Sequence, residues 1–158
     1  MLKIIGIFLF TVFCATVTAT ATAKERKRCK SAEELYLLLK EIRHGVCEEA
    51  RPLSDIYKSV SYPTLGQTPF IDILREKGLS DALESVPLPL PESLLSSLRL
   101  YASGLGRRFI NEEIAESEKE CEAFRLWLDS YRKDLPRRIR IQRTLSLFCG
   151  SAVLLLIL

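Results

Sequence analysis

The chain has 158 residues, of which 47% are hydrophobic and 27% are charged, and its formal net charge at pH 7 is +3. This length is typical of a single domain that can bury a core of its own. The small charge excess does not favour nucleic acid as a partner, because the basic residues gather beside the two apolar ends of the chain, where a membrane surface is the nearest partner.

The N-terminal segment is predicted to be a transmembrane helix over residues 1–23. Residues 4–23 carry no ionisable side chain and would form a helix about 30 Å long, close to the hydrocarbon thickness of a bilayer. A cleaved signal peptide is the alternative, because Ala21-Thr22-Ala23 resembles a processing site. The basic residues that follow, from Lys24 to Lys30, oppose this alternative, since Lys and Arg stay on the cytoplasmic side of membrane segments.

The middle of the chain, residues 24–143, has apolar residues at helical spacing throughout. We therefore predict an all-α fold, a cytosolic bundle of about six helices flanked by two transmembrane helices. Ser31 with Glu34 resembles a capping box that opens the first helix. The apolar face of that helix comprises Leu35, Leu38, Leu39, Ile42 and Val46.

Proline and glycine mark the limits of the next helices. The second is predicted to start at Pro52, the third near Pro69 and a short fourth after Gly78. Three prolines over residues 87–91 impose an extended link before a fifth helix. Residues 104–106, Gly-Leu-Gly, are interpreted as a helix-to-helix corner, because the remaining glycine and the strand of a dinucleotide-binding loop are missing.

The last helix before the C-terminal segment has the most regular spacing. Its predicted seam consists of Ile110, Ile114, Ser117, Cys121, Phe124, Leu128, Tyr131 and Leu135. This seam favours packing against the preceding helix, and dimerisation through it is the alternative, so that an oligomer is possible. Pro136 is expected to kink or restart the helix. Residues 144–158 are uncharged and predicted to form a C-terminal transmembrane helix, although 15 residues span only roughly 22 Å.

Catalytic chemistry finds little support in the sequence. His44 is the only histidine and is expected to be a helix-end or surface residue. The pairs Glu48-Glu49 and Glu112-Glu113 are expected to be solvated, since adjacent residues on a helix point apart. Cys47 and Cys121 are expected to be buried or partly buried thiols. We therefore predict no enzyme, no cofactor and no metal site.

Several short motifs occur together along the chain. They are Met1-Leu2-Lys3-Ile4-Ile5-Gly6, Glu41-Ile42-Arg43-His44-Gly45, Arg51-Pro52-Leu53-Ser54-Asp55, Gly78-Leu79-Ser80-Asp81-Ala82-Leu83, Leu105-Gly106 and an apolar tail that contains Gly150. Together they resemble the stage III sporulation protein AB family. That family is similar to the cytoplasmic helical domain of the platform proteins of type II secretion and type IV pilus machines.

The resemblance implies a non-catalytic membrane platform in an endospore-forming bacterium. Its place would be the mother-cell membrane that faces the forespore, with both termini across the membrane and the central domain in the cytoplasm. Its implied partners are a cytosolic secretion-type ATPase and other stage III sporulation channel proteins. The alternative function is a secreted or membrane-tethered helical binding protein with a cleaved signal peptide.

Two repeated helix starts and one corner are the candidate docking sites. Residues 52–60 and 78–86 share Leu, Ser, Asp, Ser and Val in register. At the corner, residues 107–113 depart from the family, which usually has an Asp and then a Gln there. The candidate docking residues are Ser54, Asp55, Ser80, Asp81, Arg107 and Arg108.

Overall fold

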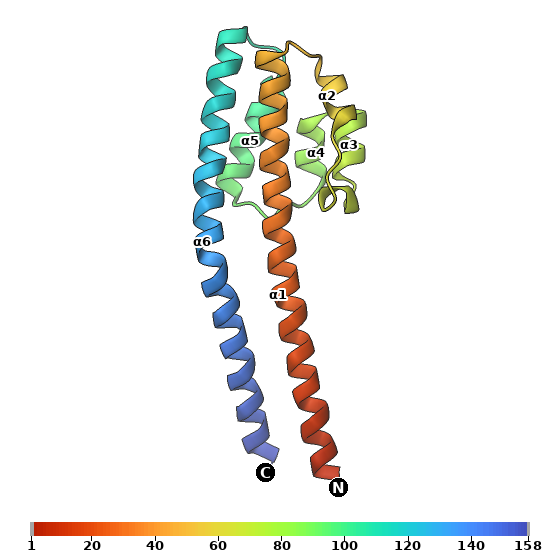
Figure 1. Ribbon diagram of the computed structural model, residues 1–158, viewed down its shortest axis with the longest axis vertical. Helices are drawn as coiled ribbons and strands as arrows, with labels where there is room; N and C mark the ends of the chain where they lie inside the picture. The colour runs from red at the N-terminus through yellow and green to blue at the C-terminus, as the bar shows by residue number, and fades with distance from the viewer. Residues whose placement is uncertain (1, 158) are drawn as a thin grey trace. The chain divides into compact units, whose positions relative to one another are not determined.

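The computed structural model of the chain describes the backbone of residues 2–157 and the side chains of residues 12, 13, 15–145 and 148. Every regular element in this part of the chain is helical, which confirms the predicted all-α class (Figure 1). The six α-helices of the described backbone are α1 Leu2–Arg43, α2 Leu53–Ser59, α3 Phe70–Lys77, α4 Leu79–Ser85, α5 Glu92–Gly104 and α6 Ile110–Ile157.

The chain divides into two compact units. Met1–Arg28 and Tyr131–Leu158 form one, which we call the helix-pair unit, and Cys29–Ser130 form the other, the bundle unit. Helices α1 and α6 contribute to both. The flanking segments that the sequence predicted as separate transmembrane helices are therefore continuous with the first and last helices of the bundle unit.

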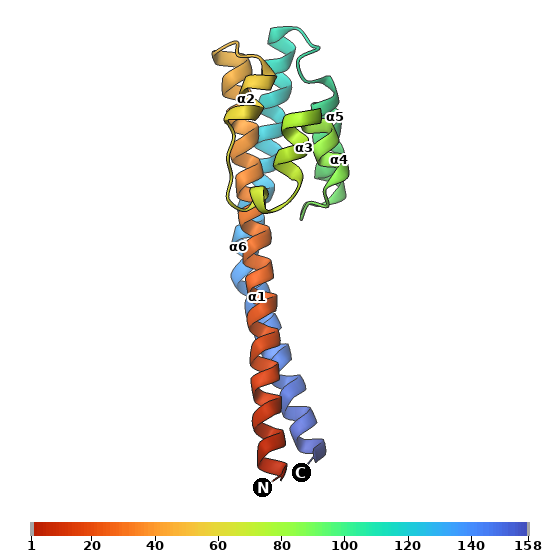
Figure 2. The same cartoon turned by 90° about the vertical axis from the view of Figure 1, so that its right-hand side faces the viewer.

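In the bundle unit, α4 packs between α3 and α5, and α3 also contacts α2. Figure 2 shows α3, α4 and α5 on one side of the segments that α1 and α6 contribute. The predicted starts of the second to the fifth helix are confirmed within a residue. Pro52 and Pro91 are extended N-caps with φ near −65°. Gly78, at φ +94°, alone separates α3 from α4.

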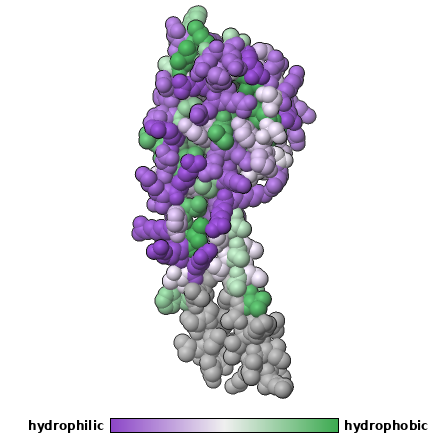
Figure 3. Space-filling view, in the orientation of Figure 1, coloured by the Kyte–Doolittle hydropathy of each residue, from purple (hydrophilic) through white to green (hydrophobic). Residues whose placement is uncertain are grey.

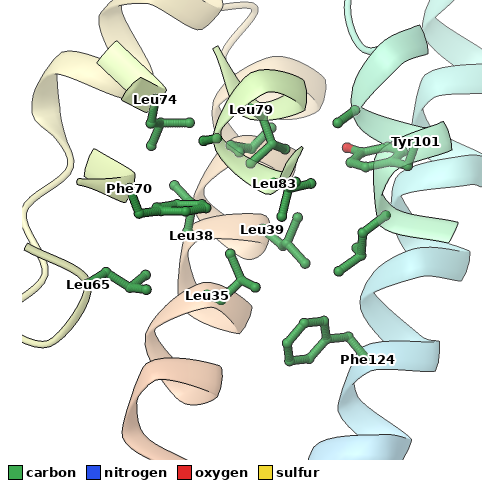
Figure 4. Packing of buried hydrophobic residues seen from close by; sticks show 14 of the residues in the cluster. Leu35, Leu38, Leu39, Leu65, Phe70, Leu74, Leu79, Leu83, Tyr101 and Phe124 are labelled. Carbon is green, nitrogen blue, oxygen red and sulfur yellow. The ribbon is translucent and has the colours of Figure 1, made fainter. Parts of the chain in front are cut away.

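The core of the bundle unit is made by the apolar faces that helical spacing predicts (Figure 4). From α1 it receives Leu35, Leu38, Leu39 and Ile42, while Val46 is only partly buried. Phe70 and Phe124, from α3 and α6, are completely buried. Burial of each such side chain stabilises the fold by about 1.5–3 kcal/mol.

The predicted capping box at Ser31 and Glu34 is wrong, because α1 already runs through these residues as a helix. The Glu34 side chain is buried and accepts hydrogen bonds from the backbone N–H groups of Thr64 and Leu65 instead. These groups begin the 3-10 turn Leu65–Gln67, so Glu34 caps an element about 30 residues further along the chain.

The end of α1 widens into a π-helical turn, His44–Glu48. Gly45 is buried there, and a Cβ on it would lie 2.5 Å from Cδ1 of Ile56, so the glycine allows α2 to approach α1 closely. The chain then reverses through Ala50, which has φ +52° although it is not a glycine.

The predicted seam of α6 is confirmed from Ile114 onward but not at its start. Ser117, Cys121, Phe124 and Leu128 are buried, whereas Ile110 is 53% exposed. Pro136 does not restart the helix, since it lies inside the continuous α6.

In the helix-pair unit, α1 and α6 run antiparallel and side by side (Figures 1 and 2). The Tyr131 hydroxyl donates a hydrogen bond of 3.0 Å to Glu25 across the pair. Among the residues that the structure describes, no helix combines the length and the apolarity needed to cross a membrane. The spans predicted at residues 1–23 and 144–158 fall mostly on side chains outside the described set.

Candidate docking surface

The predicted docking residues of α2 lie at its exposed first turn. The side chains of Ser54 and Asp55 are both exposed, and the Ser54 hydroxyl donates a 3.5 Å hydrogen bond to Asp55. The buried face of the same helix consists of Ile56 and Tyr57. The packing of these two residues anchors α2 to the core and leaves the polar side chains of its first turn exposed to solvent.

The corner between α5 and α6 packs directly against the start of α2. Gly106 has φ +75°, and a Cβ on it would lie only 3.2 Å from Cδ1 of Leu53. Leu105, before it, is buried in the core. The structure therefore brings two of the predicted docking elements, the α2 start and the corner, to the same end of the bundle unit.

The two arginines of the corner differ in their surroundings. Arg107 is exposed. Arg108 is half-buried and folds back, with its guanidinium 6.0 Å from the centre of the Tyr101 ring. A Cβ on Gly104 would collide with that guanidinium, so the glycine provides the space that Arg108 occupies. Arg107 is thus available to a partner, whereas Arg108 mainly covers the core.

Two apolar side chains beside Arg107 were not among the predicted docking residues. Phe109 is 82% exposed and Ile110 is 53% exposed, at the point where α6 begins. Figure 3 shows hydrophobic atoms gathered at this end of the bundle unit within a mostly hydrophilic surface. The sequence contains a usable indication, since two consecutive large apolar residues directly follow two arginines at a helix start.

The second repeated helix start, in α4, lies next to α2 rather than at the corner. Asp81 is exposed and Ser80 is half-buried. The Tyr57 side chain of α2 reaches this start, where it receives a hydrogen bond from the backbone of Leu79 and lies 3.8 Å from the Cβ position of Gly78. The Ser80-Asp81 pair therefore belongs to a neighbouring surface, one helix away from the corner.

Behind the corner lies a buried polar cluster that sequence reasoning missed. Glu113 was expected to be solvated, but it is 2% exposed, because its carboxylate turns inward to accept a 3.4 Å hydrogen bond from the Gly106 N–H. The Cys47 sulfur lies 3.8 Å from the Ser117 hydroxyl. Burial, and then the nearby Glu113 carboxylate, raise the pKa of the Tyr101 hydroxyl.

The thiols and the histidine have the surroundings that the sequence predicts. Cys47 is half-buried and Cys121 is buried, both unpaired, and burial raises the pKa of the Cys121 thiol. His44 is exposed between Glu48, at 2.7 Å, and Glu49, at 3.4 Å. In the part of the chain that the structure describes, no three His, Cys, Asp or Glu residues come together as metal ligands would.

Comparison of the chain with protein-family models, with curated proteins and with solved structures finds no match.

Proposed function

We propose that the protein is a non-catalytic membrane platform that docks a cytosolic ATPase. The uncharged ends of α1 and α6 cross the membrane, and the bundle unit lies in the cytoplasm. The observation that carries the proposal is the surface at the α5–α6 corner, where exposed Arg107, Phe109 and Ile110 adjoin the polar start of α2. Aromatic and arginine side chains are the residues most enriched at the centres of protein interfaces.

The rigidity of this surface supports a docking role. Gly106 packs against Leu53, and Glu113 accepts a hydrogen bond from the Gly106 N–H, so the corner is fixed before a partner arrives. A preformed surface loses little conformational entropy on binding. The proposed partner, a secretion-type ATPase, comes from the motifs that resemble the stage III sporulation protein AB family. The same resemblance gives the proposed setting, the channel between mother cell and forespore.

The test is co-purification of the ATPase with the full-length protein from solubilised membranes. The double variant Arg107→Glu/Phe109→Ser removes the charge and the aromatic anchor of the corner. Its matched control is Lys77→Glu/Leu100→Ser, which changes an exposed lysine of α3 and a leucine of α5 that is 71% exposed. We expect the corner variant to lose the ATPase and the control to retain it. Equal recovery of the ATPase with both variants would show that the corner is not the docking surface.

Charge reversal tests the two Leu-Ser-Asp helix starts separately. Asp55→Lys changes the α2 start beside the corner, and Asp81→Lys changes the α4 start. We expect the first to weaken recovery of the ATPase more than the second, because only α2 adjoins the corner. Reporter fusions after Lys30 and Ser130 test the topology, and activity of a periplasm-dependent reporter alone would favour a secreted or tethered binding protein.

A further inference from the structure

The helix-pair unit carries both basic clusters of the sequence. One lies on α1 and the other on α6, and the hydrogen bond from Tyr131 to Glu25 sets the register of the two helices. All their cations are exposed. We call this set the collar: Lys24, Arg26, Lys27, Arg28, Arg132, Lys133, Arg137, Arg138, Arg140 and Arg143.

The collar is staggered along the helix pair. At 1.5 Å per residue, Arg140 lies roughly 14 Å from Tyr131 along α6, and Thr16 lies roughly 14 Å from Glu25 along the antiparallel α1. The α6 arginines therefore lie beside the uncharged, threonine-bearing stretch of α1 rather than beside its basic cluster. A membrane surface at the level of Arg137, Arg140 and Arg143 therefore meets α1 along residues 13–19, on the N-terminal side of its basic cluster.

Exposed apolar side chains occupy the same stretch as the α6 arginines. Phe13 and Val17 of α1 are 62% and 46% exposed, and Ile141 and Leu145 of α6 are 49% and 58% exposed. In Figure 3, hydrophilic residues flank hydrophobic ones on this part of the helix pair. Cations interleaved with apolar side chains on a helical surface are typical of the boundary between headgroups and acyl chains.

Few acidic residues occur in the two stretches of sequence that form the collar. The carboxylates in these two stretches are Glu25 and Asp134. Glu25 already pairs with Arg28 at 3.1 Å and accepts the hydrogen bond of Tyr131. Guanidinium groups at a lipid interface require anionic partners, and phosphate oxygens match their geometry.

We propose that the collar is a binding surface for the headgroups of anionic phospholipids, with Arg137, Arg140 and Arg143 as its main contacts. The inference rests on the proposed membrane location of the helix pair, but not on the ATPase. Arg138 has a different role, because its guanidinium lies 5.3 Å from the centre of the Tyr131 ring and packs against it. Because of the stagger, the basic residues of α1 and those of α6 lie at different levels along the helix pair. Lipid headgroups beside α6 therefore contact most of the positive charge.

The test is native mass spectrometry of the full-length protein in nonionic detergent, with phosphatidylglycerol or phosphatidylcholine added. The wild type should retain phosphatidylglycerol preferentially. The triple variant Arg137→Gln/Arg140→Gln/Arg143→Gln should bind it on the order of a hundredfold more weakly, since each basic residue near a membrane surface contributes about fivefold. The matched control Lys40→Gln/Lys58→Gln/Lys77→Gln removes the same charge from exposed sites of the bundle unit and should bind like the wild type.

Four outcomes overturn the inference. They are equal retention of the two lipids by the wild type, equal loss in the control variant, displacement of the lipid by inorganic phosphate alone, and a lipid-free dimer as the main species. Circular dichroism confirms that the variants are folded. A protein that integrates into membranes but shows no lipid preference overturns this inference alone, because the reporter fusions and the ATPase recovery test the proposed function separately.

Discussion

The Glu34 carboxylate on α1 lies 2.7 Å from the backbone nitrogen of Leu65 and 2.9 Å from that of Thr64, and it accepts a hydrogen bond from both. The two N–H groups open a 3-10 turn, where no preceding carbonyl is available to them. Glu34 is 6% exposed, so water does not replace it as an acceptor. This contact joins the α2–α3 connection to α1.

Replacement of Glu34 by Ala should therefore destabilise the bundle unit by about 3 kcal/mol, because it leaves two buried donors without their charged acceptor. Glu34→Gln should cost about half as much, since its amide oxygen still accepts one hydrogen bond. Urea unfolding followed by the fluorescence of Trp127, the only tryptophan, measures both. Glu84→Ala, on the exposed side of α4, is the control and should change stability little.

Ala50 gives a prediction of the opposite sign. It follows the π-helical turn with φ +52°, a conformation that costs a residue with a Cβ about 1–2 kcal/mol relative to glycine. Ala50→Gly should thus stabilise the protein by about 1 kcal/mol. The same replacement at Ala123, an exposed residue inside α6, should destabilise it by about 0.5–1 kcal/mol. If both variants unfold at lower urea concentration than the wild type, the left-handed turn contributes no strain.

Gly106 links stability to the docking surface. A Cβ there meets Leu53 at 3.2 Å, and its φ of +75° disfavours any L side chain. We expect Gly106→Ala to cost about 1–2 kcal/mol and to weaken recovery of the ATPase, because the corner shifts away from α2. Gly66→Ala is the control, since nothing lies within 4 Å of its Cβ position. If a destabilised Gly106→Ala protein recovers the ATPase fully, docking does not depend on the geometry of the corner.

Much of the bundle unit is predictable because proline and glycine determine its helix limits locally. Pro52, Pro69 and Pro91 each precede a helix, and Gly78 ends one, and these effects need no tertiary partner. The spacing of apolar residues likewise defines the buried faces, since a helix has only one side to turn toward the core.

The roles of the buried carboxylates could not be predicted in this way. Ser31 and Glu34 fit a capping box as well as they fit a helix interior, and the donors that bury Glu34 are 30 residues away. Glu113 turns inward because the Gly106 N–H lies beneath it, a relation that depends on the corner geometry. Ile110 fits the heptad spacing but is exposed, because it lies at the corner, outside the core. In each case a tertiary contact overrides a correct local pattern.

Tyr57 gives a prediction for alkaline pH. Burial raises its pKa to about 12, although the backbone hydrogen bond from Leu79 acts in the other direction. In the unfolded chain a tyrosine titrates near pH 10, so the folded state holds the phenol proton more tightly than the unfolded state. The stabilisation is complete below pH 10 and is lost between pH 10 and about 12, at a cost of about 2 kcal/mol at the upper limit.

The comparison of wild type with Tyr57→Phe tests this assignment. The variant lacks the hydroxyl and should be about 1 kcal/mol less stable at neutral pH, because it loses the hydrogen bond to the α4 start. Its stability should then fall less steeply above pH 10 than that of the wild type. Burial and the Glu113 carboxylate raise the pKa of Tyr101 as well, so the double variant Tyr57→Phe/Tyr101→Phe should have the shallowest dependence. Urea unfolding at a series of alkaline pH values measures the three slopes, and parallel slopes would mean that another group controls the alkaline loss of stability.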